Sequence, residues 1–212
     1  MKPHRIFLAP SLLAAATGAA AQATITHEQA LAGNVTPGDA PGCPVTISVP
    51  GHYVLKGNLQ VPFNAGGIFI TASGVTLDRN GFSVSGPGNC VYGVTQMSCT
   101  LPGILDNGER LEKSGIRVSS SAHGVTVRNG SVRGFRGNGV VGSSLLLQDL
   151  AVLHNRHVGL DVAGAHAPSI VSTTRVGFNG GHGIQGSNVI VDRSAITMNG
   201  GHGMWSNRAQ VP

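Results

Sequence analysis

The sequence predicts an all-β fold in which short strands stack into a coil of parallel sheets. The pentapeptide Asn-Gly-Gly-His-Gly occurs at residues 179–183 and again, 20 residues later, at 199–203. A repeat length of 20 to 24 residues is typical of stacked-unit architectures. A glycine followed by an apolar residue also recurs at intervals of 48, 24, 20, 24 and 20 residues, in the pairs Gly67-Ile68, Gly115-Ile116, Gly139-Val140, Gly159-Leu160, Gly183-Ile184 and Gly203-Met204.

Each repeat contains three short apolar segments separated by Gly, Ser, Asn or Asp. In the unit that begins at Gly67 they are residues 68–70, 75–77 and 82–84. Identical segments of successive units stack in parallel, because hairpins would need antiparallel partners. We therefore expect a coil that rises about 4.8 Å per turn, in which each of the three positions (the first, second and third strand slots) forms a parallel sheet. The 32 glycines suit tight corners between strands.

Composition shifts along the chain predict its organisation. Residues 1–23 have the pattern of a secretory signal peptide: a basic start, an apolar middle at 6–16, and small residues for cleavage after Ala21 or Ala23. Residues 24–66 are expected to form an N-terminal cap and a first irregular coil. The regular repeats follow over 67–212, with an inserted loop at about 87–114 that returns near the first slot. The predicted localisation is secreted or periplasmic, and no apolar run predicts stable membrane insertion.

Charge and cysteine content exclude some classes of function. Two of the 14 Lys and Arg residues fall in the signal segment, which leaves 12 against 9 Asp and Glu residues, without a basic cluster. Nucleic-acid binding has little support from this pattern. Cys90 and Cys99 share one Gly/Pro-rich segment and are the expected disulfide, which leaves Cys43 as a buried or free thiol. Three scattered cysteines make no zinc signature, so we predict no metal site and no cofactor.

Several motifs resemble a known superfamily. They are Gly74–Asp78 with Asn80-Gly81, Gly124–Val127 with Asn129-Gly130, and the two Asn-Gly-Gly-His-Gly units. Over residues 45–211 they resemble the parallel β-helices of the pectate-lyase-like superfamily, especially repeat domains associated with carbohydrate binding and sugar hydrolysis. The resemblance implies a single-stranded right-handed parallel β-helix of about six coils. Such coils carry lyases, hydrolases, epimerases, adhesins and spacers, so the resemblance fixes no activity.

One outward-facing row is the candidate polysaccharide-binding face. It follows the inward apolar residue of each first-slot strand and contains Phe69, Arg117, Val141, Asp161, Gln185 and Trp205. In the superfamily the equivalent sheet usually holds the sugar. Trp205 is then a stacking platform for a sugar ring, Arg117 pairs with a uronate carboxylate, and Gln185 and His202 contact substrate. Alternatively, Trp205 only covers an exposed coil.

Asp161 and His182 are the candidate catalytic residues. The segment Gly181-His182-Gly183 follows Asp161 by one coil, which resembles part of the motif set of polygalacturonase-like glycosidases. Leu160 stands where a second aspartate is wanted, and glycoside hydrolysis ordinarily needs two carboxylates. His182 and His202 occupy identical positions one coil apart. The alternative for this pair is a corner role, in which histidine is chosen for its tolerance of unusual backbone angles.

These observations predict an exported, carbohydrate-associated protein without a complete active site. Two alternatives remain. One is a lyase, hydrolase or epimerase that acts on a uronate-type polymer, and the other is a structural or adhesin-like coil or a truncated fragment. The sequence stops at Pro212, partway round a coil, and an uncapped strand edge of this kind favours self-association.

Overall fold

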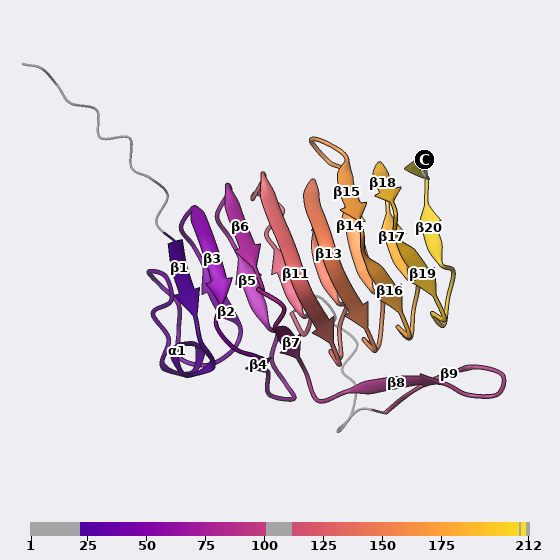
Figure 1. Ribbon diagram of the computed structural model, residues 1–212, viewed down its shortest axis with the longest axis horizontal. Coiled ribbons are helices and arrows are strands. Elements are labelled where there is room, and N and C mark those ends of the chain that lie inside the picture. Colours follow the sequence, from indigo (N-terminus) through magenta and orange to yellow (C-terminus); the bar gives the residue numbers. More distant parts are fainter. Residues whose placement is uncertain (1–21, 101–111, 208, 211–212) are drawn as a thin grey trace, which may run out of the picture.

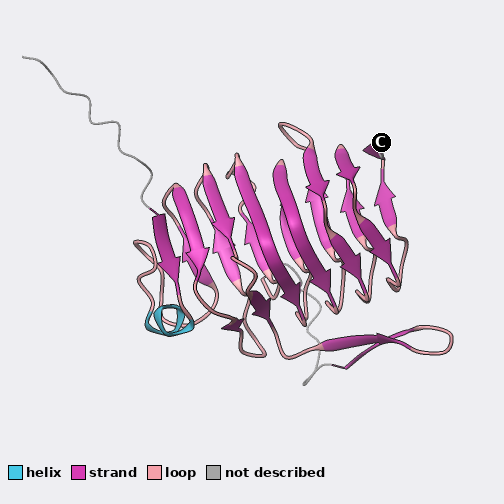
Figure 2. Cartoon of the chain, viewed as in Figure 1, coloured by secondary structure: helices cyan, strands magenta, loops and turns pink. Residues whose placement is uncertain are grey.

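The protein is a parallel β-solenoid of about six turns, as predicted from its sequence (Figure 1). The computed structural model describes residues 22–100, 112–207 and 209–210. Most of the predicted signal segment, residues 101–111 of the predicted insertion and Pro212 lie outside these residues. Within them, strands stack along one axis, and the short helix α1 (His27–Ala32) lies at the N-terminal end of the stack (Figure 2). The side chain of Thr26 caps α1 by accepting a hydrogen bond from the amide of Gln29.

One sheet collects the first strand of every turn. Its seven strands pair in parallel in the order β2, β5, β10, β12, β14, β17 and β20. Their bounds are Val45–Ile47, Ile68–Ile70, Ile116–Val118, Val140–Ser143, Leu160–Ala163, Ile184–Gly186 and Met204–Ser206. Because β2 already pairs with β5, the first slot begins one turn before the regular repeats recognised in the sequence.

A second sheet of twelve strands holds the other two slots. Second-slot strands are β1 (Gln22–Ile25), β3 (Gly51–Leu55), β6 (Val75–Asp78), β15 (Ser169–Ser172), β18 (Val189–Asp192) and β21 (Ala209–Gln210). Third-slot strands are β4 (Leu59–Gln60), β7 (Ser83–Ser85), β16 (Arg175–Gly177) and β19 (Ala195–Thr197). In the middle of the stack, β11 (Val125–Arg133) and β13 (Leu145–Leu153) each run through both slots.

The two long strands correct the prediction of three separate strands in every turn. The chain turns between the second and third slots at residues with positive φ, Asn129 (56°) and Gly130 (144°) in β11 and Asp149 (51°) in β13. Such a narrow corner does not interrupt the pairing, since β11 and β13 remain in register on both sides of it. Asn and Asp adopt this left-handed conformation more readily than most residues.

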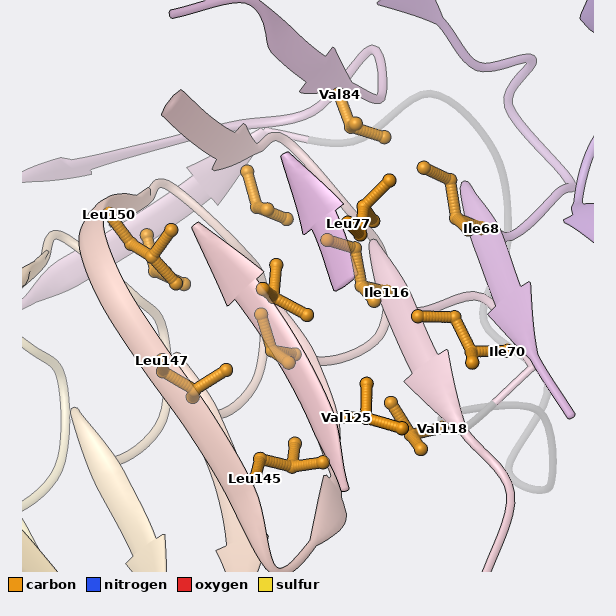
Figure 3. Packing of buried hydrophobic residues seen from close by; sticks show 14 of the residues in the cluster. Ile68, Ile70, Leu77, Val84, Ile116, Val118, Val125, Leu145, Leu147 and Leu150 are labelled. Carbon is orange, nitrogen blue, oxygen red and sulfur yellow. The ribbon is translucent and has the colours of Figure 1, made fainter. Parts of the chain in front are cut away.

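The core is a set of aliphatic columns between the two sheets. Figure 3 shows side chains from the first slot, such as Ile68 and Ile116, facing second-slot side chains such as Leu77 and Leu147. These residues are at most 1% exposed. Each buried Val, Leu or Ile stabilises the fold by roughly 1.5–3 kcal/mol relative to an exposed one. The columns explain why the apolar pattern repeats with the length of one turn.

One of the described arginines is fully buried. Arg79 is 0% exposed and donates a hydrogen bond from Nη2 to the carbonyl of Gly130 at 3.0 Å, while its Nε and Nη1 have no partner among the described residues. Gly130 leaves no room for a side chain, since a Cβ there would lie 2.4 Å from the carbonyl oxygen of Phe82 and 3.0 Å from the Cβ of Arg79. Burial lowers the pKa of Arg79 to about 9, against the opposing attraction of Asp78.

The corner between the third and first slots is held by an asparagine ladder, Asn155, Asn179 and Asn199. The Oδ1 atom of Asn179 accepts hydrogen bonds from both the backbone amide and Nδ2 of Asn155, each at 3.0 Å. Oδ1 of Asn199 accepts the same two bonds from Asn179, at 3.1 and 3.0 Å. Because Asn155 and Asn179 are fully buried, the ladder satisfies corner groups that water does not reach.

Candidate functional site

The seven-stranded sheet presents one continuous outward row, and its register is the one predicted. Residues that follow the inward apolar position pair strand by strand, in the order Thr46, Phe69, Arg117, Val141, Asp161, Gln185 and Trp205. We call these seven residues the outer row. Thr46 is an addition to the predicted set. It was missed because its turn lacks the Gly-apolar signature from which the row was identified.

Two depressions adjoin along the outer row, and Asp161 lines both. The first has a volume of about 390 Å³ and is bounded by Phe69, Arg117 and Val141. The second, of about 370 Å³, is bounded by His157, His182 and Gln185. The structure therefore brings the two predicted catalytic residues to one depression, and it places Arg117 on the far side of Asp161.

Asp161 is half-buried and held by a neighbour that the sequence interpretation missed. Asn138 donates a hydrogen bond from Nδ2 to Oδ2 of Asp161 at 3.1 Å. Oδ1 of Asn138 accepts the backbone amide of Val158 at 3.0 Å, which fixes the orientation of the amide. Burial raises the pKa of Asp161, and the hydrogen bond from Asn138 opposes this rise. The net effect makes Asp161 a weaker acid than a solvated aspartate.

Asn138 belongs to a second series of hydrogen bonds, at residues that directly precede the repeated glycines. The amide of Asn138 donates to Oγ of Ser114 at 3.2 Å, and the amide of His202 donates to Nδ1 of His182 at 2.9 Å. Because Nδ1 of His182 accepts, the neutral ring carries its hydrogen on Nε2. Four of the six repeated glycines follow a polar residue, Ser114, Asn138, His182 or His202, and this pattern was the signal that could have revealed Asn138.

The two motif histidines are neighbours in successive turns, as their identical positions one coil apart predict. Neither His182 nor His202 has a positive φ, so turn conformation does not explain them. Their rings stack with centroids 5.2 Å apart and planes inclined by 8°. The ring of His182 also stacks with Trp205 at 6.0 Å, and Trp205 remains 49% exposed. This aromatic stack forms the C-terminal end of the outer row.

The other end of the row carries a cation stacked on a ring. The guanidinium carbon of Arg117 lies 3.8 Å from the ring centroid of Phe69, which precedes it by one turn. Such a contact orients the guanidinium and leaves its edge to donate hydrogen bonds. Asp161 is two strands away, across Val141, so Arg117 and Asp161 flank the first depression without pairing.

The described part of the insertion is a hairpin, β8 (Asn89–Tyr92) and β9 (Met97–Thr100), closed by a disulfide between Cys90 and Cys99. It runs along the solenoid towards its C-terminal end (Figure 1). It packs on the asparagine corner and not against the predicted row: Sγ of Cys90 lies 3.4 Å from the carbonyl oxygen of Asn155. Cys43 is the free cysteine, and burial raises its pKa.

The preceding turn and the hairpin together explain the first glycine after each motif asparagine. A Cβ at Gly180 would lie 2.1 Å from the carbonyl oxygen of Arg156 and 2.8 Å from Sγ of Cys99. One at Gly200 would lie 2.3 Å from the carbonyl oxygen of Gly180 and 3.1 Å from the Cβ of Met97. The second glycine leaves room for a histidine ring, since a Cβ at Gly201 would lie 2.6 Å from Nδ1 of His182. The repeated motif therefore encodes a corner covered by the hairpin, next to the outer row.

The described residues contain no group of three or more His, Cys, Asp or Glu side chains that could hold a metal ion. In the same part of the chain, no helix has the length and apolar character needed to cross a membrane. Comparisons with protein-family models, with curated proteins and with solved structures gave no significant match. The resemblance to the pectate-lyase-like superfamily therefore rests on the motifs and on the parallel solenoid.

Proposed function

We propose that the outer row binds an extended polysaccharide whose chain runs along the solenoid axis. The observation that carries this proposal is the unbroken parallel register that aligns charged, amide and aromatic side chains on one face, beside two adjoining depressions. From Phe69 to Trp205 the row crosses five strand steps, or roughly 24 Å at the usual strand spacing. This length suits an oligomer better than a single sugar.

The chemistry of the row suits a sugar chain. Trp205 is half exposed and held parallel to His182, so one of its faces is available to the apolar face of a pyranose ring. Asp161 and Gln185 provide acceptors and a donor for hydroxyl groups. The guanidinium of Arg117, oriented by Phe69, can donate two parallel hydrogen bonds to a uronate carboxylate.

An active polysaccharide lyase, hydrolase or epimerase is the second candidate. The observation in its favour is that Asp161, whose pKa is raised, shares a depression with His182 and is oriented by Asn138. Asp161 is the one carboxylate among the described residues that line either depression, whereas glycoside hydrolysis ordinarily uses two. This difference favours binding over turnover.

The test is to incubate the purified mature protein with uronate-containing and neutral polysaccharides, following binding, unsaturated products and reducing ends together. We expect binding without turnover. Trp205→Ala should weaken binding about tenfold, because about 1.5 kcal/mol of stacking is lost. Products that disappear in Asp161→Asn would instead establish the enzyme. Absence of both binding and products would leave a structural role.

We also propose that the protein is exported. The cysteine pair in the hairpin suits an oxidising compartment, where disulfides persist. The strand β1 begins at Gln22 and pairs with β3, so cleavage after Ala21 would leave this strand whole. N-terminal sequencing of protein recovered outside the cytoplasm tests this; an N-terminus at Met1 there would contradict it.

A further inference from the structure

A third depression lies apart from the outer row. It has a volume of about 300 Å³ and is formed by third-slot residues of the twelve-stranded sheet together with the first residues of the hairpin. It shares no residue with the two depressions described above. Its side chains come from Gln60, Ser85, Asn89, Arg133 and His154.

The charge in this depression is positive and uncompensated. Arg133 ends β11 and is exposed, and its guanidinium has no hydrogen bond or ion pair with any described residue. None of the described residues that line the depression is acidic. A guanidinium presents a rigid fork of donors that matches the geometry of carboxylate, sulfate and phosphate oxygens.

Two neighbouring groups are oriented by the fold. The hydroxyl of Ser85 donates to Oε1 of Gln60 at 3.2 Å, so the amide nitrogen of Gln60 keeps its hydrogens for another acceptor. The ring of His154 stacks on Phe178 with centroids 5.2 Å apart. Its Nδ1 lies 2.5 Å from the carbonyl oxygen of Cys90, and because a carbonyl only accepts, this nitrogen carries a hydrogen.

We propose that this depression binds an oxyanion group, either a free anion or a carboxylate or sulfate substituent of a polymer. Arg133 provides the charge and Gln60 a further donor. Asn89, on the hairpin, forms part of the opposite wall. An anion that contacts both Arg133 of the solenoid and Asn89 of the hairpin ties the hairpin to the solenoid. Ligand should therefore slow hydrogen exchange of the hairpin amides.

The test is a titration of the full mature protein with sulfate and, separately, acetate at constant ionic strength, followed by the NMR signals of Gly86, Gly88, Asn89 and the Arg133 side chain. We expect saturable shifts confined to these residues. Arg133→Gln should weaken binding about tenfold or more, because a charge-assisted hydrogen bond is lost. Arg175→Gln, which removes an exposed arginine outside the depression, should leave the affinity unchanged.

Shifts that do not saturate, that spread over the surface, or that persist in a folded Arg133→Gln variant would overturn the proposal. The source of the anion is distinguished by a further titration with uronate and sulfated oligosaccharides. Tighter binding of an oligosaccharide than of the free anion supports a polymer substituent. Equal affinity supports a free oxyanion. Neither affinity bears on binding by the outer row, which the Trp205→Ala variant tests separately.

Discussion

The asparagine ladder gives the sharpest expectation for stability. In Asn179→Ala the backbone amide and side-chain amide of Asn155 lose their common acceptor, and the carbonyl of Val152 loses the donor that now lies 3.1 Å away. Each buried group left unsatisfied costs about 1–3 kcal/mol. Allowing for partial relaxation, we expect a loss of about 4 kcal/mol in the free energy of unfolding.

The matched variant is Asn199→Ala. It removes the same two acceptor bonds from the next rung, but Asn199 is half-buried, so water can replace the lost partners. We expect a loss of about 1–2 kcal/mol. Both variants are measured by urea unfolding monitored with circular dichroism, with the m-values compared. Equal losses at the two positions, or a loss below about 1 kcal/mol for Asn179→Ala, would refute the claim that burial determines how much the asparagine ladder stabilises the fold.

Three further predictions follow from the packing and the charges. Gly180→Ala should disturb the backbone at Arg156, displace the hairpin and speed reduction of its disulfide by dithiothreitol, because the new Cβ would lie 2.1 Å from the carbonyl oxygen of Arg156 and 2.8 Å from Sγ of Cys99. Gly57→Ala, with open space at its Cβ position, should do neither. Arg79→Met should be at least as stable as the parent protein in thermal unfolding, because an apolar side chain replaces a desolvated guanidinium. In the parent protein, Arg79 should add stability as the pH rises above about 9, because folding lowers its pKa to about this value. Folding raises the pKa of Asp161, so its contribution to the free energy of unfolding is full below pH 3.8 and decreases as the pH rises through its pKa in the folded protein. Asp161→Asn should remove this decrease in stability and should therefore unfold at a higher temperature than the parent protein at neutral pH.

The repeat length and the outer row could be predicted because each turn contributes the same positions to the same sheet. The recurring Gly-apolar pair, from Gly67-Ile68 to Gly203-Met204, is enough to place Arg117, Asp161 and Trp205 in one row. The strand boundaries were harder to predict from the sequence. Whether the chain at Asn129 interrupts a strand or turns it depends on the backbone angles of Asn129 and Gly130, which composition does not specify.

The parts of the site that were missed depend on contacts between different turns. Asn138 bonds to Asp161, 23 residues further along the chain, and its position before the repeated Gly139 does not by itself indicate this partner. The path of the hairpin was also unpredictable from spacing, because it is fixed by the packing of Cys99 and Met97 on Gly180 and Gly200. A repeat pattern predicts which residues align, but not which non-repeated segment covers them.

The most direct test of polysaccharide binding by the outer row is an NMR map of the wild-type protein during titration with oligosaccharides of increasing length from the polymer that binds best. We expect shifts at Arg117, Asp161, Gln185 and Trp205 together, with affinity that rises until the oligomer spans the row, roughly 24 Å long. Shifts centred elsewhere, or an affinity independent of oligomer length, would contradict the assignment of this face.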